Sequence, residues 1–203
     1  MKTRPILFNA EAVQGILAGR KTQTRRPVKP QPQLGKPWRH GWTIDPQEMD
    51  VPIAFCPYGI PGDRLWVRET WAALESQNSR KPRQTEGPFW YKADRGLAHM
   101  RQGLCRSLSS SDAGKWRPSI HMPRWASRLT LEVTAVRVER VQNITSDDAQ
   151  AEGCKSTYTG QSGSWWYDYT VDFIRLWNSI YAKRGYGWSA NPWLWVVEFE
   201  VTQ

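Results

Sequence analysis

The sequence predicts an α+β, mainly β fold, in which short flanking helices and long loop insertions decorate a small β-barrel of about five or six strands. The first observation is the alternation of inward and outward residues over four segments, at 64–72, 89–94, 129–141 and 193–201. The second is the presence of only a few short segments with helical spacing. The length of 203 residues suits a single domain, 1–203.

The N-terminal part is predicted to contain a short strand and a helix. Residues 5–8 (PILF) suit a strand, and Asn9 can then cap a helix with Glu11 in its first turn. Gly19 is a natural stop for this helix. The apolar positions that give the helix one buried face are Ala12, Val13, Ile16 and Leu17.

Three segments are predicted to be insertions. Residues 27–61 contain eight prolines, which disfavour regular structure. Residues 95–115 are rich in serine and poor in apolar residues, and 154–170 are rich in Gly, Ser, Tyr and Trp. We expect all three to be loops at the surface.

The C-terminal half is predicted to contain two strands and two helices. Leu129, Leu131 and Val133 alternate with polar residues, as in a half-buried strand. Thr145 and Asp148 have the spacing of a capping box, which predicts a short helix ending at Gly153. A second helix is expected at 171–182, and the final strand is WLWVVEFEV at 193–201.

Composition excludes several classes of protein. The chain has no apolar run of about 18 residues and no sustained apolar segment after its basic start, so we expect no membrane span and no secretory signal. Cys56, Cys105 and Cys154 form no CxxC pair, which argues against a disulfide framework. His40, His99 and His121 lack metal-ligand spacing. We expect a cytoplasmic protein without metal or cofactor.

Charge and aromatic content favour a polyanionic partner. The 28 Lys and Arg exceed the 19 Asp and Glu, and the formal net charge is +9. Thirteen tryptophans could stack on unpaired bases. Equally, the tryptophans could fill a core while basic side chains solvate the surface.

Two weak signals suggest chemistry. Lys21 and Thr24 lie three residues apart, so a turn would bring an amine near a hydroxyl that it could activate if burial lowered the lysine pKa. Glu152 ends the predicted helix at a position that the helix dipole disfavours for a carboxylate. The alternative is that Lys21 and Thr24 belong to a solvated basic loop and that Glu152 is a solvated surface side chain.

A third signal is a basic and aromatic set that suits a nucleobase and its phosphate. Packing of the rings on the barrel, covered by arginine stems, is the alternative. The residues expected to bind nucleic acid or nucleoside are Arg20, Arg25, Arg26, Arg68, Glu69, Trp71, His121, Arg124 and Trp125.

Four segments together resemble the ASCH domain family. They are ILAGRKTQTRR at 16–26, GDRLWVRETW at 62–71, LTLEVTAVRVERVQNITSDDAQAEG at 129–153 and WLWVVEFEV at 193–201. The resemblance implies a PUA-like β-barrel. The WRPSIHMPRWASR and KRGYGW segments are similar to those of long ASCH proteins encoded by phages and prophages.

The resemblance also implies an activity. AGRKTQTR is similar to the segment that carries a lysine and a threonine in small bacterial ASCH enzymes that hydrolyse N4-acetylcytidine. Lys21 and Thr24 match those positions, and Glu152, three residues after Ala149, matches their glutamate. The resemblance makes Thr24 the nucleophile, Lys21 its base and Glu152 the group that handles the proton or orients water.

The sequence therefore predicts a protein, expected to be a monomer, that binds a nucleobase, nucleoside or RNA in a basic cleft. It also predicts an amidohydrolase acting on N4-acetylcytidine or a related N-acylated nucleoside. The chain is about twice as long as those enzymes, which leaves the substrate open. An RNA-binding module or ribonuclease is one alternative, and a phage module that binds another protein is the other.

Overall fold

The structure is a computed structural model that describes residues 1–32, 53–73, 89–94, 98–100, 103–105, 114–161 and 164–202. The α-helices are α1 (Ala10–Leu17), α2 (Ser146–Ala151) and α3 (Thr170–Tyr181). The short 3-10 helices are η2 (Ile53–Phe55), η3 (Lys92–Asp94), η5 (Ser119–His121), η6 (Arg124–Ala126), η7 (Val141–Asn143), η8 (Ala182–Arg184) and η9 (Trp188–Ala190).

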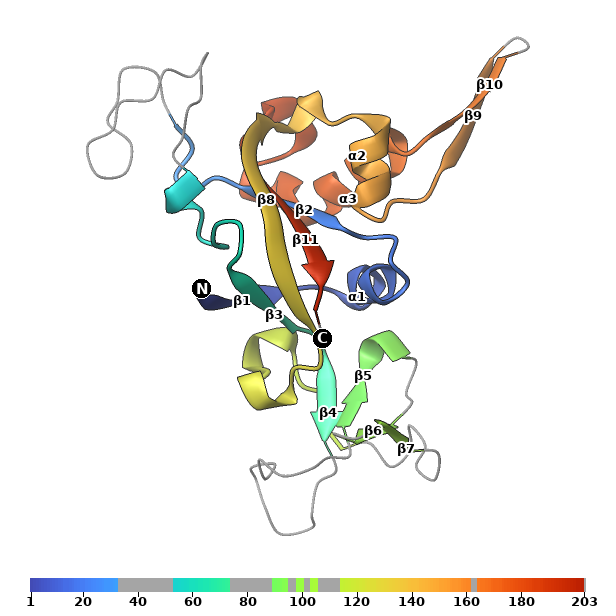
Figure 1. The fold of residues 1–203 in the computed structure, drawn as a ribbon. Helices are drawn as coiled ribbons and strands as arrows, with labels where there is room; N and C mark the ends of the chain where they lie inside the picture. Colours follow the sequence, from blue (N-terminus) through green and yellow to red (C-terminus); the bar gives the residue numbers. More distant parts are fainter. Residues whose placement is uncertain are drawn as a thin grey trace. The chain divides into compact units, whose positions relative to one another are not determined.

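The strands lie in three sheets. The largest has five strands in the order β1-β3-β8-β11-β2, and β4, β5, β6 and β7 form a second sheet in chain order (Figure 1). Strands β9 and β10 form a two-stranded ribbon. The strands are β1 (Thr3–Leu7), β2 (Gln23–Pro27), β3 (Arg64–Arg68), β4 (Trp71–Ala73), β5 (Phe89–Tyr91), β6 (Ala98–Met100), β7 (Gly103–Cys105), β8 (Thr130–Arg140), β9 (Thr157–Gln161), β10 (Ser164–Asp168) and β11 (Trp193–Val201).

The chain divides into two compact units. Unit 1 comprises residues 1–18, 64–131 and 201–203, and unit 2 comprises 19–63 and 132–200. In unit 1, β1 pairs in parallel with β3, so Thr3 lies beside Arg64 and Leu7 beside Arg68. The residue ranges show that each unit is assembled from segments that are distant in the sequence.

The core of unit 1 contains aromatic rings from its small sheet. Trp71 meets Phe89 edge-on at 6.2 Å, and Trp125 packs against both rings. The buried Glu69 and the partly buried Asp94 both accept hydrogen bonds from Arg128. One arginine therefore neutralises two carboxylates inside this unit.

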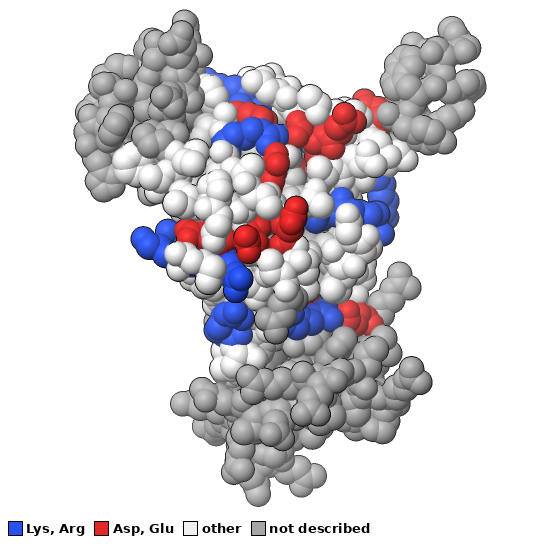
Figure 2. Space-filling view, viewed as in Figure 1, with Lys and Arg blue, Asp and Glu red and all other residues white. Residues whose placement is uncertain are grey.

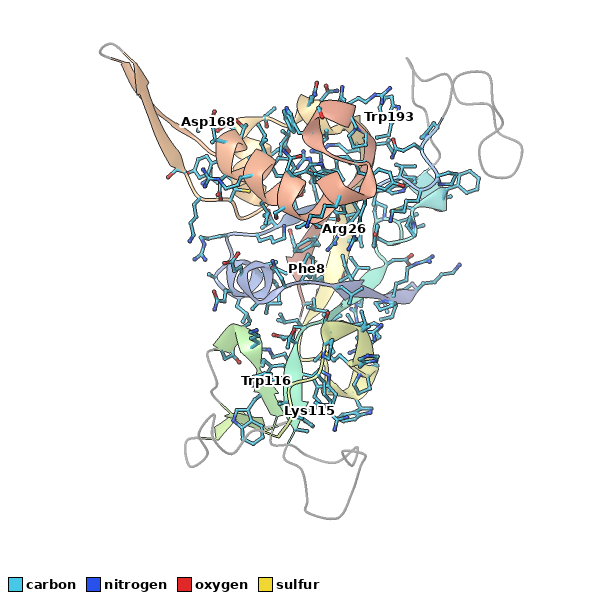
Figure 3. The ribbon with its side chains drawn as sticks, turned by 180° about the vertical axis from the view of Figure 1, so that it is seen from behind. Phe8, Arg26, Lys115, Trp116, Asp168 and Trp193 are labelled. Atoms are coloured by element: carbon cyan, nitrogen blue, oxygen red, sulfur yellow. The ribbon has the colours of Figure 1, made fainter. Side chains whose placement is uncertain are left out.

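The core of unit 2 lies under α3, which covers one side of its strands in the view from behind (Figure 3). Phe173, Trp177 and Tyr181 recur every four residues and are buried, so they form the inner stripe of the helix. Leu194 of β11 belongs to the same cluster. Antiparallel pairing places Leu194 beside Pro27, and this register fixes which β2 side chains face α3.

Most of the predicted elements are confirmed. The helix after Asn9 forms as α1, and the Asn9 side chain accepts a hydrogen bond from the Ala12 backbone N–H at 2.8 Å. The capping box of Thr145 and Asp148 forms at α2. The last strand has the predicted bounds, 193–201, and the predicted 171–182 helix is α3.

Two aspects of the predicted fold are wrong. In the part of the chain that the structure describes, the strands form open sheets instead of a closed barrel, with β1 and β2 at the edges of the largest sheet. The segment 23–27, for which no strand was predicted, is strand β2. Its charges hid the strand signal, because the buried Arg25 is paired with carboxylates that are distant in the sequence.

The predicted insertions are partly strands. Residues 157–161 and 164–168 pair as β9 and β10, and 98–100 pair with 103–105. The sequences TYTGQ and SWWYD do not alternate polar and apolar residues over their whole length, so they gave no strand signal. The Pro-rich segment at 33–52 lies outside the described residues.

The packing of α3 predicts a difference in stability between two substitutions on that helix. Phe173→Ala removes a ring that is 3% exposed and should lower the free energy of unfolding by about 3–5 kcal/mol. Leu176→Ala alters a side chain that is 37% exposed and should cost less than about 1 kcal/mol. Urea unfolding followed by tryptophan fluorescence measures both. Equal losses of unfolding free energy in the two variants would contradict the assignment of Phe173 to the buried face of α3.

Candidate functional site

Lys21 and Glu152 meet inside unit 2 because helix α2 ends where strand β2 begins. The two residues form an antiparallel bridge, and the Thr22 backbone N–H donates to the Ala151 carbonyl at 2.9 Å. Gly153 lets the chain leave the helix, since its φ of +83° is rarely adopted by other residues. A Cβ at this glycine would lie 3.1 Å from Cβ of Lys21. The backbone thus brings the amine and the carboxylate together.

The Lys21 ammonium group is fully satisfied in this position. Its Nζ donates to Oε2 of Glu152 at 2.5 Å, to the Glu152 carbonyl at 2.8 Å and to the Gln23 carbonyl at 2.8 Å. Three acceptors require three protons, so the geometry is that of a charged ammonium. Burial lowers the pKa of Lys21 below its ordinary 10.5, and the Glu152 carboxylate opposes this shift.

Glu152 keeps one oxygen without a hydrogen bond. Its Oε2 is held by Lys21, whereas Oε1 is buried and has no hydrogen-bond partner among the described residues. Nη1 of Arg25 lies 3.8 Å from this oxygen, which is beyond hydrogen-bond distance. Buried polar atoms in native proteins almost always have a partner, so an orphaned carboxylate oxygen suggests a position for a water or a ligand.

Arg25 supports the carboxylates around this pair. Its side chain is completely buried, and its Nη2 lies 3.2 Å from Asp148 and 3.3 Å from Glu139. The guanidinium also lies 6.0 Å from the ring centroid of Phe173. A buried arginine that contacts several carboxylates is committed to structure and is not available to a phosphate.

We call the connected set of charged and polar groups the β2–α2 network. Gln23 links its parts, because its amide donates to Asp148 and Glu198 and its oxygen accepts from Arg25. Arg137 adds hydrogen bonds to Glu139, Asp148 and Glu198. The members are Lys21, Gln23, Arg25, Arg137, Glu139, Asp148, Glu152 and Glu198.

The network alters the pKa of Asp148, one of its members, and of the neighbouring Cys154. Burial raises the pKa of Asp148, but Arg25, the capping bonds from Thr145 and the Gln23 amide outweigh it and lower that pKa to about 2. Burial and the neighbouring Glu152 raise the pKa of the Cys154 thiol to about 12, so this cysteine is not a thiolate nucleophile.

Acidic and basic side chains also lie next to each other on the face of the molecule drawn in Figure 2.

Thr24 lies apart from the pair formed by Lys21 and Glu152. Side chains alternate along β2, so Thr24 points to the face opposite Gln23 and Arg25. Its cross-strand neighbour is Val197, whereas Arg25 is paired with Val196 and Gln23 with Glu198. The structure thus brings together two of the three residues expected to form the site, and no contact described for Thr24 joins it to them.

The residues expected to bind nucleic acid fall into two groups. Those that are buried or packed are Arg25, Glu69, Trp71 and the partly buried Trp125. Those with exposed or half-exposed side chains are Arg20, Arg26, Arg68, His121 and Arg124. The packed residues belong to a core or an ion-pair network, so only the second group presents charge to a partner.

Several network residues were missed from the sequence. Gln23 lies two residues from both Lys21 and Arg25, so a strand assignment for 23–27 would have placed it on the same face as Arg25. Arg137 and Glu139 are likewise two residues apart in β8, so they lie on one face of that strand. Asp148 was identified only as a cap. No sequence signal connects Glu198 with these residues.

Neither a metal centre nor a membrane span is found in the described segments. No group of three or more His, Cys, Asp or Glu side chains there could hold a metal ion. No described helix is long and apolar enough to span a bilayer.

Comparisons with known proteins give little beyond this geometry. No family model matches the sequence, and no curated protein matches it. Among solved structures, the chain is similar to protein EF3133 from Enterococcus faecalis V583, of the DUF984 family, with 12% identity and a TM-score of 0.40. The alignment covers 100% of this chain and 80% of that one.

The lowered pKa of Asp148 predicts a pH-dependent contribution to stability. The ionised carboxylate stabilises the fold above its ordinary pKa of 3.8, and this contribution is lost as the pH falls towards about 2. Asp148→Asn should therefore unfold more easily than the wild type at pH 6, and the difference should shrink as the pH falls from 4 to 2.

Chemical denaturation at each pH measures this difference. Asp147→Asn is the matched control, because Asp147 lies on the same helix with an exposed side chain. A difference between Asp148→Asn and the wild type that stays constant from pH 6 to pH 2 would contradict the charge-based account.

Proposed function

We propose that this chain is an ASCH-like amidohydrolase that removes an acyl group from the exocyclic amine of an N-acylated nucleoside such as N4-acetylcytidine. The observation that carries the proposal is the buried Lys21–Glu152 pair, in which Oε1 of Glu152 has no hydrogen bond. The substrate class rests on the resemblance of AGRKTQTR at 18–25 to the acetylcytidine amidohydrolases.

The geometry favours Glu152 as the base. Lys21 has three acceptors and therefore no free lone pair, so it cannot accept a proton in the observed arrangement. Its ammonium group instead binds Oε2 of Glu152 and leaves Oε1 without a hydrogen bond, in a position to contact a water molecule. This assignment keeps the proton-handling role that the resemblance gives to Glu152 and changes the role of Lys21.

The reaction is a hydrolysis with water as the nucleophile. Oε1 of Glu152 takes a proton from water while the water oxygen attacks the acyl carbon. The tetrahedral intermediate then collapses, the C–N bond breaks, and the proton passes from Glu152 to the leaving amine. The products are the free carboxylic acid and the unmodified nucleoside. Oε1 is buried, so substrate entry requires a local displacement of neighbouring side chains.

The assay is the release of acetate and cytidine from N4-acetylcytidine. Glu152→Gln should lower kcat/KM by about 10²–10⁴-fold, because the amide cannot accept the proton from water. Lys21→Met should also lose most activity, since it leaves the carboxylate without its cation. Glu200→Gln, an exposed change on β11, should keep the wild-type rate. Circular dichroism verifies that each variant folds.

Thr24→Val separates two chemical routes. We expect this variant to retain activity, because Thr24 lies on the other face of β2. Loss of activity with intact folding would restore Thr24 as the nucleophile. A wild-type protein that is inactive on N-acylated nucleosides but binds RNA would refute the hydrolase proposal and leave a binding module.

A further inference from the structure

Positive charge is distributed unequally between the two units. The described residues of unit 1 contain nine Lys and Arg and three Asp and Glu. Those of unit 2 contain eleven Lys and Arg and ten Asp and Glu. In unit 1, two of the three carboxylates, Glu69 and Asp94, are bound to Arg128. The excess charge that could attract a polyanion therefore belongs to unit 1 and not to the β2–α2 network.

Part of this charge gathers around one tryptophan ring. The guanidinium carbon of Arg68 lies 5.4 Å from the centroid of Trp66, and that of Arg124 lies 5.8 Å from it. Arg68 also donates a hydrogen bond to the Ile120 carbonyl, which brings η5 beside β3. Ile120 and the adjacent His121 are exposed. We call Trp66, Arg68, Ile120, His121 and Arg124 the β3–η6 patch.

The two arginines of this patch lack acidic partners. Among the described residues, no carboxylate forms an ion pair with Arg68 or Arg124, although both cations lie within 6 Å of one ring centroid. Cation–π contacts position the guanidinium groups without neutralising them. A phosphate oxygen bound to either guanidinium supplies the negative charge that no described carboxylate provides.

We propose that the β3–η6 patch binds the phosphodiester backbone of a polynucleotide. Guanidinium groups pair with phosphate oxygens through two parallel hydrogen bonds, which suits a repeating phosphate chain. The exposed Lys115 and the 40% exposed Trp116, labelled in Figure 3, belong to the same unit. This site is distinct from the one proposed for hydrolysis, and its assignment does not depend on that activity.

The test is binding of fluorescent single-stranded 12-mers of RNA and DNA across a range of salt concentrations. Arg68→Gln/Arg124→Gln should reduce the log–log salt slope by about 1.4, at about 0.7 per lost phosphate contact. At 0.1 M salt, this change in slope corresponds to about 25-fold weaker binding. Equal effects on RNA and DNA indicate recognition of phosphodiester alone, and a larger effect on RNA indicates an additional contact to the 2′-hydroxyl.

Arg175→Gln/Arg184→Gln is the matched control, because it removes the same charge from exposed positions of unit 2. The proposal requires this control to bind close to wild-type strength. Equal weakening of both double variants would overturn it, since net charge alone would then explain binding. It is also overturned if the wild type binds neither oligonucleotide at 50 mM salt, or if 10 mM inorganic phosphate displaces the 12-mer completely. Arg124→Glu alone, at an exposed position, keeps the test valid if Arg68→Gln fails to fold.

Discussion

The buried ammonium group of Lys21 is the feature on which the rest of unit 2 depends. A charge that is 94% removed from water is tolerable only with close acceptors, and the end of α2 supplies two of the three. Removing Glu152 alone would leave that charge without its counterion, a loss that typically costs about 3–5 kcal/mol. The capping box, the exit at Gly153 and the pairing of Thr22 with Ala151 all serve to hold this contact.

Ion pairing within each unit explains how the charges of the chain are divided. Lys21, Arg25 and Arg137 are held by carboxylates in unit 2, so a basic segment of sequence becomes an internal network. In unit 1, Arg128 binds two carboxylates, whereas Arg68 and Arg124 lie within 6 Å of the Trp66 ring centroid. The net charge of +9 therefore does not locate a polyanion-binding site. The ion pairs inside each unit determine which cations remain for a polyanion.

The sequence predicted those elements whose signals are local. The capping box at Thr145 and the apolar stripe of α3 depend on neighbours within four residues, so they are readable without a structure. Strand β2 was missed because its buried Arg25 is stabilised by Glu139 and Asp148, more than 100 residues away. The contact of Lys21 with Glu152 was expected only from a resemblance, while the opposite orientation of Thr24 follows from the strand that was not predicted.

The protonation state of Lys21 tests the central claim most directly. With ¹⁵N-labelled protein at neutral pH, the Nζ signal of Lys21 should show three attached protons that exchange slowly with water, since all three are donated to buried acceptors. In Glu152→Gln, the same signal should lose its protons at a lower pH than in the wild type, because the carboxylate that raises the lysine pKa is gone. A neutral amine with two protons at pH 7 would contradict the account, since Lys21 could then act as the base and Glu152 would not need to.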